Sequence, residues 1–368
     1  MLSHLDSLLD QIGAAQVSFV NPPVLKLDFT GAANVADFSA IDDSVRGIIL
    51  DNINSMFTLP NRYLVKLDAN NDYFKTYLYP LGVLRVTVEN ASGFAEEAKG
   101  GMKKLFNKVT RAAPDCYVKT QVGAETEFKT KTINNKHHPA WNETHDFVVS
   151  DMDQVVKFEL YDSDVNGDDE IGMAVTTVKE SLKSGGKHDL SLVTKKGEET
   201  DGHLTVSVEY FDYVADGGSF NASSHKGEGK DCGLATVLVA AAMGIKGDRA
   251  SLKPSVKVTW GENHTYQTAQ KTDAPGTDIN NPSFDQNFRM PIDSVGGWIS
   301  SKAEDFHIAL MDGQKEVGSV SVPFADVEKA EGMILQKDFD VGNGAKVRAA
   351  IALRGLGSGQ QQLPNRTK

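Results

Sequence analysis

A series of short β-strand patterns dominates the first half of this 368-residue chain. Residues 82–89, Gly-Val-Leu-Arg-Val-Thr-Val-Glu, alternate in a way that is typical of a strand with one buried face. Further runs of strand-forming residues, with turn residues between them, lie at 116–122, 126–131, 144–149, 155–161, 170–177, 187–192 and 203–211. Short strands in such close succession predict an antiparallel β-sandwich.

The stretch between two of these strands is strongly acidic. From Asp162 to Asp169 it reads Asp-Ser-Asp-Val-Asn-Gly-Asp-Asp and contains no Lys or Arg. Carboxylates this close raise one another's pKa, and a bridging cation removes the cost of their repulsion. Oxygen ligands without His or Cys suit calcium. The stretch therefore predicts a calcium-binding loop, with a solvated acidic turn as the alternative.

An EF-hand is excluded as the source of this acidic pattern. The opening Asp162-x-Asp164-x-Asn166-Gly167 matches an EF-hand loop, but its twelfth position is Met173 where a Glu is required. The segment before the loop, 155–161, is β-branched and aromatic, which indicates a strand where an EF-hand has a helix. The acidic loop is therefore expected to join two strands.

Three segments resemble C2 domains. Residues 162–172 are similar to the acidic third loop of that family, 138–143 (His-Pro-Ala-Trp-Asn-Glu) to its N-P-x-W-N-E segment, and 115–118 (Asp-Cys-Tyr-Val) to its D-P-Y-V segment. The resemblance implies a calcium site that also needs acids from the first loop, where Asp115 matches one position and Glu97 is among the nearest acids for another. The metal ligands implied in this way are Asp115, Asp162, Asp164, Asp168, Asp169 and Glu97.

Two basic regions flank this candidate calcium site. The long loop 90–114 interleaves lysines with apolar residues, and its candidate lipid-binding residues are Lys103, Lys104, Leu105, Phe106 and Lys108. Each Lys near an anionic leaflet contributes about 1 kcal/mol, and apolar tips can enter the headgroup region. The alternative is a short helix packed on the rim of the sandwich. A second set, Lys119, Lys129 and Lys131, lies on adjacent strands. In some C2 domains the corresponding face binds phosphoinositides. The alternative is an ordinary solvated sheet face.

The region before the sandwich is predicted to be a small α+β segment. It has an apolar helical stripe at 1–12, a broken strand at 16–29, a helix at 37–57 and a strand at 63–67. Segments 23–31, 41–43 and 59–62 resemble the last part of the SMP lipid-transfer domain, which precedes the first C2 domain in extended synaptotagmins, tricalbins and plant synaptotagmins. Because that domain is far longer, we expect a truncated chain or one that lost its first half. The alternative is a subdomain that packs on the first C2 domain.

The second half of the chain repeats the plan of the first. Residues 254–260 correspond to the strand after Asp115, and 281–288 to the segment at 138–147. The acidic loop is reduced here to Asp312, and Lys253 replaces the Asp of the first repeat, so no calcium site is expected. The predicted organisation is an SMP-like segment at 1–78, a C2 domain at 79–213, a flexible linker at 214–230, a degenerate C2-like domain at 231–356 and a disordered tail at 357–368.

Composition narrows the classes of function. The net charge of −12 argues against nucleic acid as a partner. Two cysteines in different predicted domains imply no disulfide framework, in keeping with a reducing cytosol. No apolar run approaches the roughly 18–20 residues of a spanning helix, so we expect any membrane attachment to be peripheral or to come from residues outside this sequence. The sequence lacks the H-E-x-x-H, G-x-S-x-G and P-loop motifs, and we expect no enzyme.

Together these observations favour a mainly β protein with two C2-type sandwiches that binds anionic phospholipid membranes when calcium is present. The family resemblance implies a cytoplasmic, peripheral membrane protein at contacts between endoplasmic reticulum and plasma membrane. It also implies a glycerolipid ligand and homo-oligomerisation through the SMP-like segment as further interactions. Two alternatives are a calcium-independent protein-interaction scaffold and a lipid carrier that uses a paired SMP segment.

Overall fold

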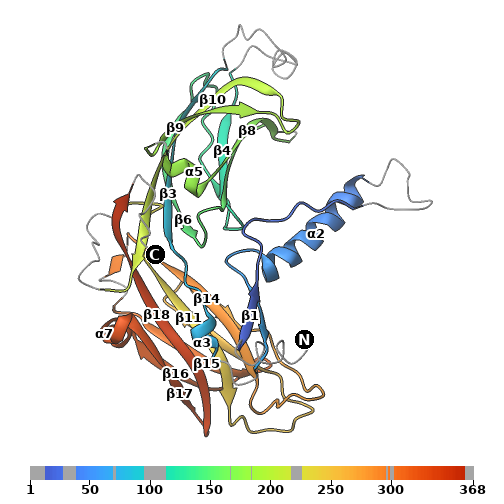
Figure 1. Cartoon of the computed structure of the whole chain (residues 1–368), viewed down its shortest axis with the longest axis vertical. Coiled ribbons are helices and arrows are strands. Elements are labelled where there is room, and N and C mark those ends of the chain that lie inside the picture. The colour runs from blue at the N-terminus through green and yellow to red at the C-terminus, as the bar shows by residue number, and fades with distance from the viewer. Residues whose placement is uncertain are drawn as a thin grey trace, which may run out of the picture. The chain divides into compact units, whose positions relative to one another are not determined.

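The computed structural model describes residues 13–27, 39–68, 72–94, 113–165, 167–183, 185–216, 226–295, 297–298 and 302–360. The chain divides into two compact units (Figure 1). The first contains residues 1–71, 79–211 and 359–368, and the second contains residues 72–78 and 212–358. Each unit is mainly β.

The first unit contains a sandwich of eight antiparallel strands. One layer has the order β6 (Ala140–Val149), β3 (Gly82–Ser92), β10 (Glu199–Val214) and β9 (Lys187–Val193). The other has the order β8 (Asp169–Thr177), β7 (Val155–Asp162), β4 (Cys116–Val122) and β5 (Phe128–Lys129). A single residue pair, Met173 with Val193, joins the layers through β8 and β9. The expected β-sandwich is confirmed, and the helix α5 (Val178–Lys183) follows β8.

The core of this sandwich comes from the alternation that the sequence displays. Leu84, Val86 and Val88 of β3 point into a core that also holds Phe147 and Phe158. The strand at 126–131 was expected to be longer: only Phe128 and Lys129 pair with β4 as β5. Thr130 remains bonded to β4, but its side chain takes over as the acceptor: its N–H donates to the carbonyl of Val118 at 2.9 Å, and its Oγ1 accepts the N–H of Val118 at 2.9 Å.

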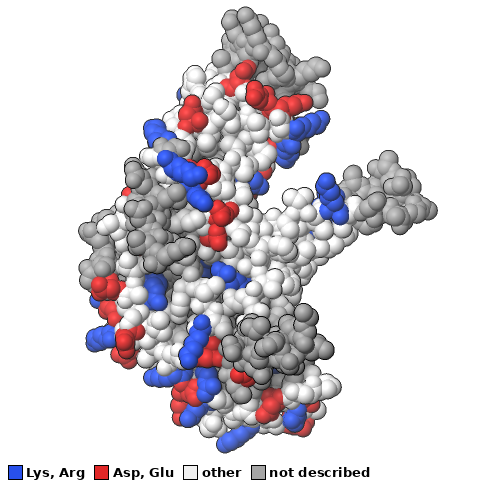
Figure 2. Space-filling model, viewed as in Figure 1, with Lys and Arg blue, Asp and Glu red and all other residues white. Residues whose placement is uncertain are grey.

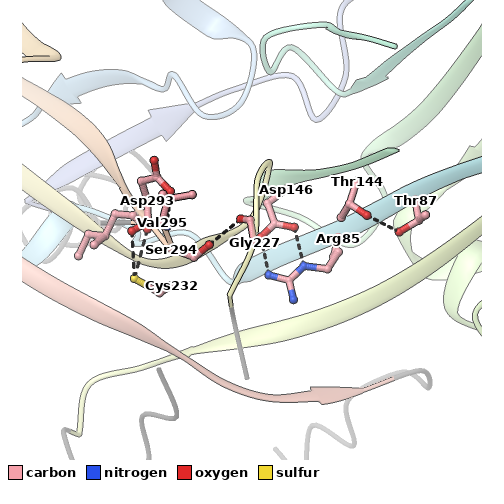
Figure 3. Close-up of polar contacts among 10 residues, drawn as sticks. Arg85, Thr87, Thr144, Asp146, Gly227, Cys232, Asp293, Ser294 and Val295 are labelled. Atoms are coloured by element: carbon pink, nitrogen blue, oxygen red, sulfur yellow. Dashed lines mark hydrogen bonds and ion pairs between the residues drawn. The ribbon is translucent and has the colours of Figure 1, made fainter. Parts of the chain in front are cut away.

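The opposite face of β3 carries a polar ladder across to β6 (Figure 3). Arg85 and Asp146 are directly opposite each other, and Arg85 Nε and Nη2 donate to the two carboxylate oxygens at 2.9 and 2.8 Å. Two residues along, the hydroxyls of Thr87 and Thr144 are 2.9 Å apart. Side-chain pairs of this kind set the register of antiparallel strands.

The segment before the sandwich is small and attached to it. A hairpin-like pair, β1 (Ala14–Val17) with β2 (Tyr63–Lys66), flanks helix α2 (Ser39–Phe57). Asn21 connects this segment to the edge of the sandwich: its Oδ1 accepts the N–H of Val155 at 2.6 Å, and its Nδ2 donates to the carbonyl of Asp153 at 3.0 Å. The predicted strand at 16–29 ends at Val17, and the predicted helix at 1–12 lies outside the described residues.

One face of the β1–β2 pair is apolar and exposed. Val17 is paired with Tyr63 and Ala15 with Val65, so these side chains share a face. Val17, Tyr63 and Val65 are exposed, as are Phe19 and Leu67 next to them. In the part of this segment that the structure describes, this face of the β1–β2 pair is left uncovered.

The second unit repeats the sandwich. One layer has the order β14 (Ser283–Asp293), β11 (Asp231–Met243), β18 (Ala345–Gln360) and β17 (Ile334–Gly342). The other has the order β13 (His264–Gln267), β12 (Pro254–Trp260), β15 (Asp305–Asp312) and β16 (Lys315–Pro323). Short helices α7 (Phe324–Lys329) and η2 (Glu331–Met333) join β16 to β17, and α3 (Tyr73–Thr76) also belongs to this unit.

The structure departs from the predicted boundaries at several places. Residues 72–78, expected in the N-terminal segment, belong to the second unit, where Tyr77 Oη donates to Asn287 Oδ1 at 3.3 Å. The end of the predicted linker is held in place, because Ser294 Oγ donates to the carbonyl of Gly227 at 2.8 Å (Figure 3). The predicted tail begins too early, since β18 continues through Gln360 and Gly357 lies against Val214 and Asp212.

Candidate functional site: the acidic end of the first sandwich

Three strand ends bring the acidic residues of the first sandwich together. In the ladder between β4 and β7, Cys116 is opposite Asp162, and in the ladder between β7 and β8, Asp162 is opposite Asp169. Asp115 immediately precedes β4, so it lies at the same end of the sheet. The β-sheet register therefore places residues that are about 50 positions apart in sequence beside one another.

Backbone hydrogen bonds lock Asp115 to the start of the acidic loop. The N–H of Asp115 donates to Asp162 Oδ1 at 2.7 Å, and the N–H of Ser163 donates to the carbonyl of Asp115 at 2.9 Å. The N–H of Asn135 donates to Asp115 Oδ1 at 2.7 Å. These bonds fix the positions of both backbones and engage only one oxygen of each carboxylate.

The pKa of the Asp162 carboxyl is raised by its burial and by the neighbouring carboxylates. Burial raises the pKa of its carboxyl, the hydrogen bond from the Asp115 N–H lowers it, and the negative charges of Asp164, Asp115 and Asp169 raise it further. The net direction is upward from 3.8. Four of the predicted ligands therefore share one negative field, which a cation would relieve.

The carboxylates do not form a closed metal cage. Among the residues that the structure describes, no group of three or more His, Cys, Asp or Glu side chains is placed to hold a metal ion. The donor chemistry nevertheless fits calcium, because all four groups are hard carboxylate oxygens on one sheet end. The side chains of Asp164 and Asp169 are exposed to the solvent from which a cation would enter.

Asp168 is placed differently from the other predicted ligands. Tyr117 Oη donates to its Oδ2 at 2.6 Å, and Oδ1 accepts from Ser163 Oγ at 3.2 Å and from the N–H of Asp164 at 3.3 Å. The hydrogen bond from Tyr117 is the largest cause of a lowered pKa of the Asp168 carboxyl, and Lys129 lowers it further. Oδ2 of this carboxylate therefore points to the Tyr117 hydroxyl on the sheet, and Oδ1 points to residues 163–164 of its own loop.

The structure adds a residue that the sequence analysis did not single out. Val165 is fully exposed at the tip of the acidic loop. An isolated apolar residue in an otherwise polar loop is the signal that would have identified it. Such a side chain is suited to the apolar boundary of a membrane.

The other candidate lipid contacts are only partly within the described residues. Glu97 and the set Lys103, Lys104, Leu105, Phe106 and Lys108 lie outside them. Lys119 is paired with Glu127 at 3.1 Å, and Lys129 Nζ lies 3.6 Å from the ring centroid of Tyr117. Lys131 is exposed. Acidic and basic side chains are interspersed on the face of the molecule shown in Figure 2.

The second sandwich has the same backbone arrangement with different charges. The N–H of Lys253 donates to Asp312 Oδ1 at 2.8 Å, and the N–H of Gly313 donates to the carbonyl of Lys253 at 2.9 Å. Pro254 is opposite Asp312, and Asp312 is opposite Lys315. Lys253 and Lys315 thus occupy the places of Asp115 and Asp169, which puts positive charge where the first sandwich has negative charge.

The two sandwiches with their strand-end loops define a protein built from tandem C2 modules. The C2 domain family matches residues 82–192 and 233–338, which is more than half of the chain, and the chain belongs to that family.

Comparison with curated proteins narrows the relationship to the extended synaptotagmins. Extended synaptotagmin-2 of Mus musculus is 23% identical over 372 residues, covering 96% of this chain and 41% of that protein. Extended synaptotagmin-3 of Homo sapiens is 31% identical over 163 residues, covering 44% of this chain and 18% of that protein. The chain resembles the extended synaptotagmins along nearly its whole length and spans about two fifths of the length of the first of these relatives.

Solved structures support the same fold. A structure of extended synaptotagmin 2 that comprises its SMP domain and two C2 domains aligns with a TM-score of 0.65 at 22% identity, covering 94% of this chain and 72% of that one. The calcium-bound pair of C2 domains of the same protein aligns with a TM-score of 0.60 at 20% identity, covering 76% of this chain and 98% of that one. The expected fold, two C2 sandwiches after an SMP-like α+β segment, is confirmed. Within the described ranges, no helix has the length and apolar character needed to cross a bilayer.

Proposed function

We propose that the first C2 domain binds anionic phospholipid membranes in a calcium-dependent manner. The observation that carries this proposal is the meeting of Asp115, Asp162, Asp164 and Asp169 at one end of the sandwich, with the pKa of Asp162 raised by burial and by the other three charges. The calcium-bound state of a structural neighbour and the membership in the C2 family support it.

In this proposal the carboxylates of the site bind calcium, and an apolar residue at the tip of the loop contacts lipid. Asp115 and Asp162 are held by the backbone bonds at the strand ends, and Asp164 and Asp169 are exposed beside them. Bound calcium would supply positive charge that neutralises the loop and attracts lipid phosphate. Val165 then enters the headgroup region as an apolar contact.

The second C2 domain has a different role in this proposal. Lys253 and Lys315 at the equivalent positions oppose calcium binding, because only Asp312 remains of the acidic set. We infer that this domain provides an additional contact surface and that the whole chain acts as a peripheral membrane-tethering protein. Contacts between endoplasmic reticulum and plasma membrane, as the family resemblance implies, are the proposed location.

Sedimentation with vesicles tests the proposal. The full chain is mixed with phosphatidylserine–phosphatidylcholine vesicles in calcium or in chelator, together with the variant Asp162→Asn/Asp164→Asn. We expect calcium-dependent binding of the unmodified protein and its loss in the double variant. Asp312→Asn in the second domain is the matched control and should bind as the unmodified protein does.

Two results would contradict the calcium mechanism. Equal sedimentation in chelator and in calcium would favour the calcium-independent scaffold instead. Calcium-dependent binding that survives Asp162→Asn/Asp164→Asn would place the ion elsewhere. Pure phosphatidylcholine vesicles separate a requirement for anionic lipid from general adhesion to bilayers.

The N-terminal segment supports a second candidate function. The exposed apolar face of the β1–β2 pair, Val17, Tyr63 and Val65, would suit a glycerolipid acyl chain or a second copy of the segment. A lipid carrier formed by paired segments is the corresponding activity. Mass spectrometry of lipids that copurify with the chain, with light scattering for oligomeric state, tests it. A lipid-free monomer would argue against this candidate.

A further inference from the structure

We propose that Asp168 is a positioning residue that Tyr117 anchors, and that it is not a calcium ligand. The inference rests on the proposed calcium site, because its consequence is the shape of the loop that carries Asp162, Asp164 and Asp169. The C2 resemblance places Asp162, Asp164 and Asp169 on the ligand pattern, with Asp168 beside them. The contacts of the Asp168 side chain indicate what this residue does instead.

Both carboxylate oxygens of Asp168 are engaged by the protein. Oδ2 accepts the phenol of Tyr117 at 2.6 Å, a short bond of the charge-assisted type. Oδ1 accepts the Ser163 hydroxyl at 3.2 Å and the N–H of Asp164 at 3.3 Å. These three donors hold Asp168 between the Tyr117 hydroxyl and the backbone of its own loop, so its orientation is set by the protein without an ion.

Tyr117 is well suited to act as an anchor. It lies in β4 and is buried, with its ring stacked on Tyr161 at a centroid distance of 5.3 Å and an interplanar angle of 13°. Tyr117 and Tyr161 are directly opposite in the ladder, and Lys129 Nζ lies 3.6 Å from the Tyr117 ring centroid. A ring packed in this way has little freedom, so its hydroxyl defines where Asp168 can lie.

The anchor determines the conformation of the loop. Asp168 binds the backbone N–H of Asp164 and the side chain of Ser163, and the N–H of Gly167 donates to the carbonyl of Asp164 at 3.2 Å. These bonds close the loop on itself and keep Asp164 beside Asp162. Tyr117 is also two residues from Asp115, so one rigid strand positions both sides of the proposed site.

The test compares calcium affinities of full-chain variants by titration calorimetry. We expect Tyr117→Phe and Asp168→Ala each to weaken calcium binding about tenfold, the effect of one hydrogen bond to a charged group. The double variant should be no weaker than Asp168→Ala, because both changes remove the same anchor. Asp168→Asn should weaken binding less than Asp168→Ala does, since its amide oxygen still accepts the phenol hydrogen while its NH2 group cannot accept the N–H of Asp164.

Asp162→Asn serves as the ligand reference and should abolish measurable binding. Thermal unfolding of each variant in chelator separates positioning from a general loss of stability. A merely structural role would lower the unfolding temperature of the variants without producing the expected order of their calcium affinities. If Tyr117→Phe does not fold, Ser163→Ala, at the loop surface, weakens the same anchor and should reduce affinity about threefold.

Three results would overturn the inference. Asp168→Asn as defective as Asp162→Asn would make Asp168 a ligand. Tyr117→Phe and Asp168→Ala could each bind calcium within about twofold of the unmodified protein while Asp162→Asn is defective. That result would show that the anchor does not act on the site, and the calcium proposal would stand. No calcium binding by the unmodified protein would remove both proposals together.

Discussion

The buried ion pair between Arg85 and Asp146 gives a sharp test of what holds the first sandwich together. Replacing Asp146 with Ala leaves the guanidinium of Arg85 without the two carboxylate oxygens that it contacts at 2.9 and 2.8 Å. The side chains of Arg85 and Asp146 are only 8% and 1% exposed, so water cannot easily take the place of the carboxylate. We therefore expect a large loss of stability.

The magnitude follows from the burial. Removing one partner of a buried pair costs about 3–5 kcal/mol, because a charge is left uncompensated. The ring of Phe211, 4.5 Å from the guanidinium carbon, contacts Arg85 in both proteins and therefore does not change the difference. The expected destabilisation is about 3–5 kcal/mol, which corresponds to a fall of roughly 10 °C in unfolding temperature for a domain of this size.

Scanning calorimetry of the full chain in chelator measures the transition of the first unit. Glu180→Ala is the matched control: it removes the exposed pair with Lys183, whose atoms are 2.6 Å apart and whose side chains are 49% and 55% exposed. That change should cost at most about 0.5 kcal/mol. If Asp146→Ala and Glu180→Ala shift the transition equally, the reasoning from burial is refuted. The double change Arg85→Met/Asp146→Leu should recover most of the stability that Asp146→Ala loses.

Three further predictions concern the candidate site and the core. Burial and neighbouring charges raise the pKa of Asp162, so without calcium its ionisation destabilises the fold. Stability in chelator should therefore fall as pH rises from 3.8 through that raised pKa, and calcium binding should weaken as pH falls through the same range. A calorimetric calcium affinity that does not change with pH would contradict this. Burial raises the thiol pKa of Cys116 and of Cys232 to about 12, so neither should react with Ellman's reagent at about pH 8 until the protein is unfolded, and rapid labelling of native protein would refute it. Val165→Ser should weaken calcium-dependent vesicle binding roughly tenfold with calcium affinity in solution unchanged, and equal sedimentation of both proteins would remove Val165 from the membrane contact.

The sandwich was predictable where alternation is strong. The strand predicted at 116–122 matches β4, and those at 155–161 and 170–177 match β7 and β8 within one residue. The pattern misplaces the end of a strand where a side chain replaces a backbone acceptor, as Thr130 does beside β5. It also misses the last residues of β18, a glycine-rich stretch that lies against Val214 and Asp212. Such contacts join residues that are separated in sequence, and a periodic pattern contains no information about them.

By itself, the sequence determined that strands enclose an acidic loop, that its oxygens suit calcium, and that a lysine replaces the corresponding acid in the second repeat. The resemblance to C2 domains set Asp168 beside the ligand pattern, but the sequence could not say what its side chain contacts. Only the tertiary structure decided that Asp162 meets Asp115, while Asp168 turns to the phenol of Tyr117. The physical reason is the register of β4, β7 and β8, which places residues from distant parts of the chain within hydrogen-bonding distance.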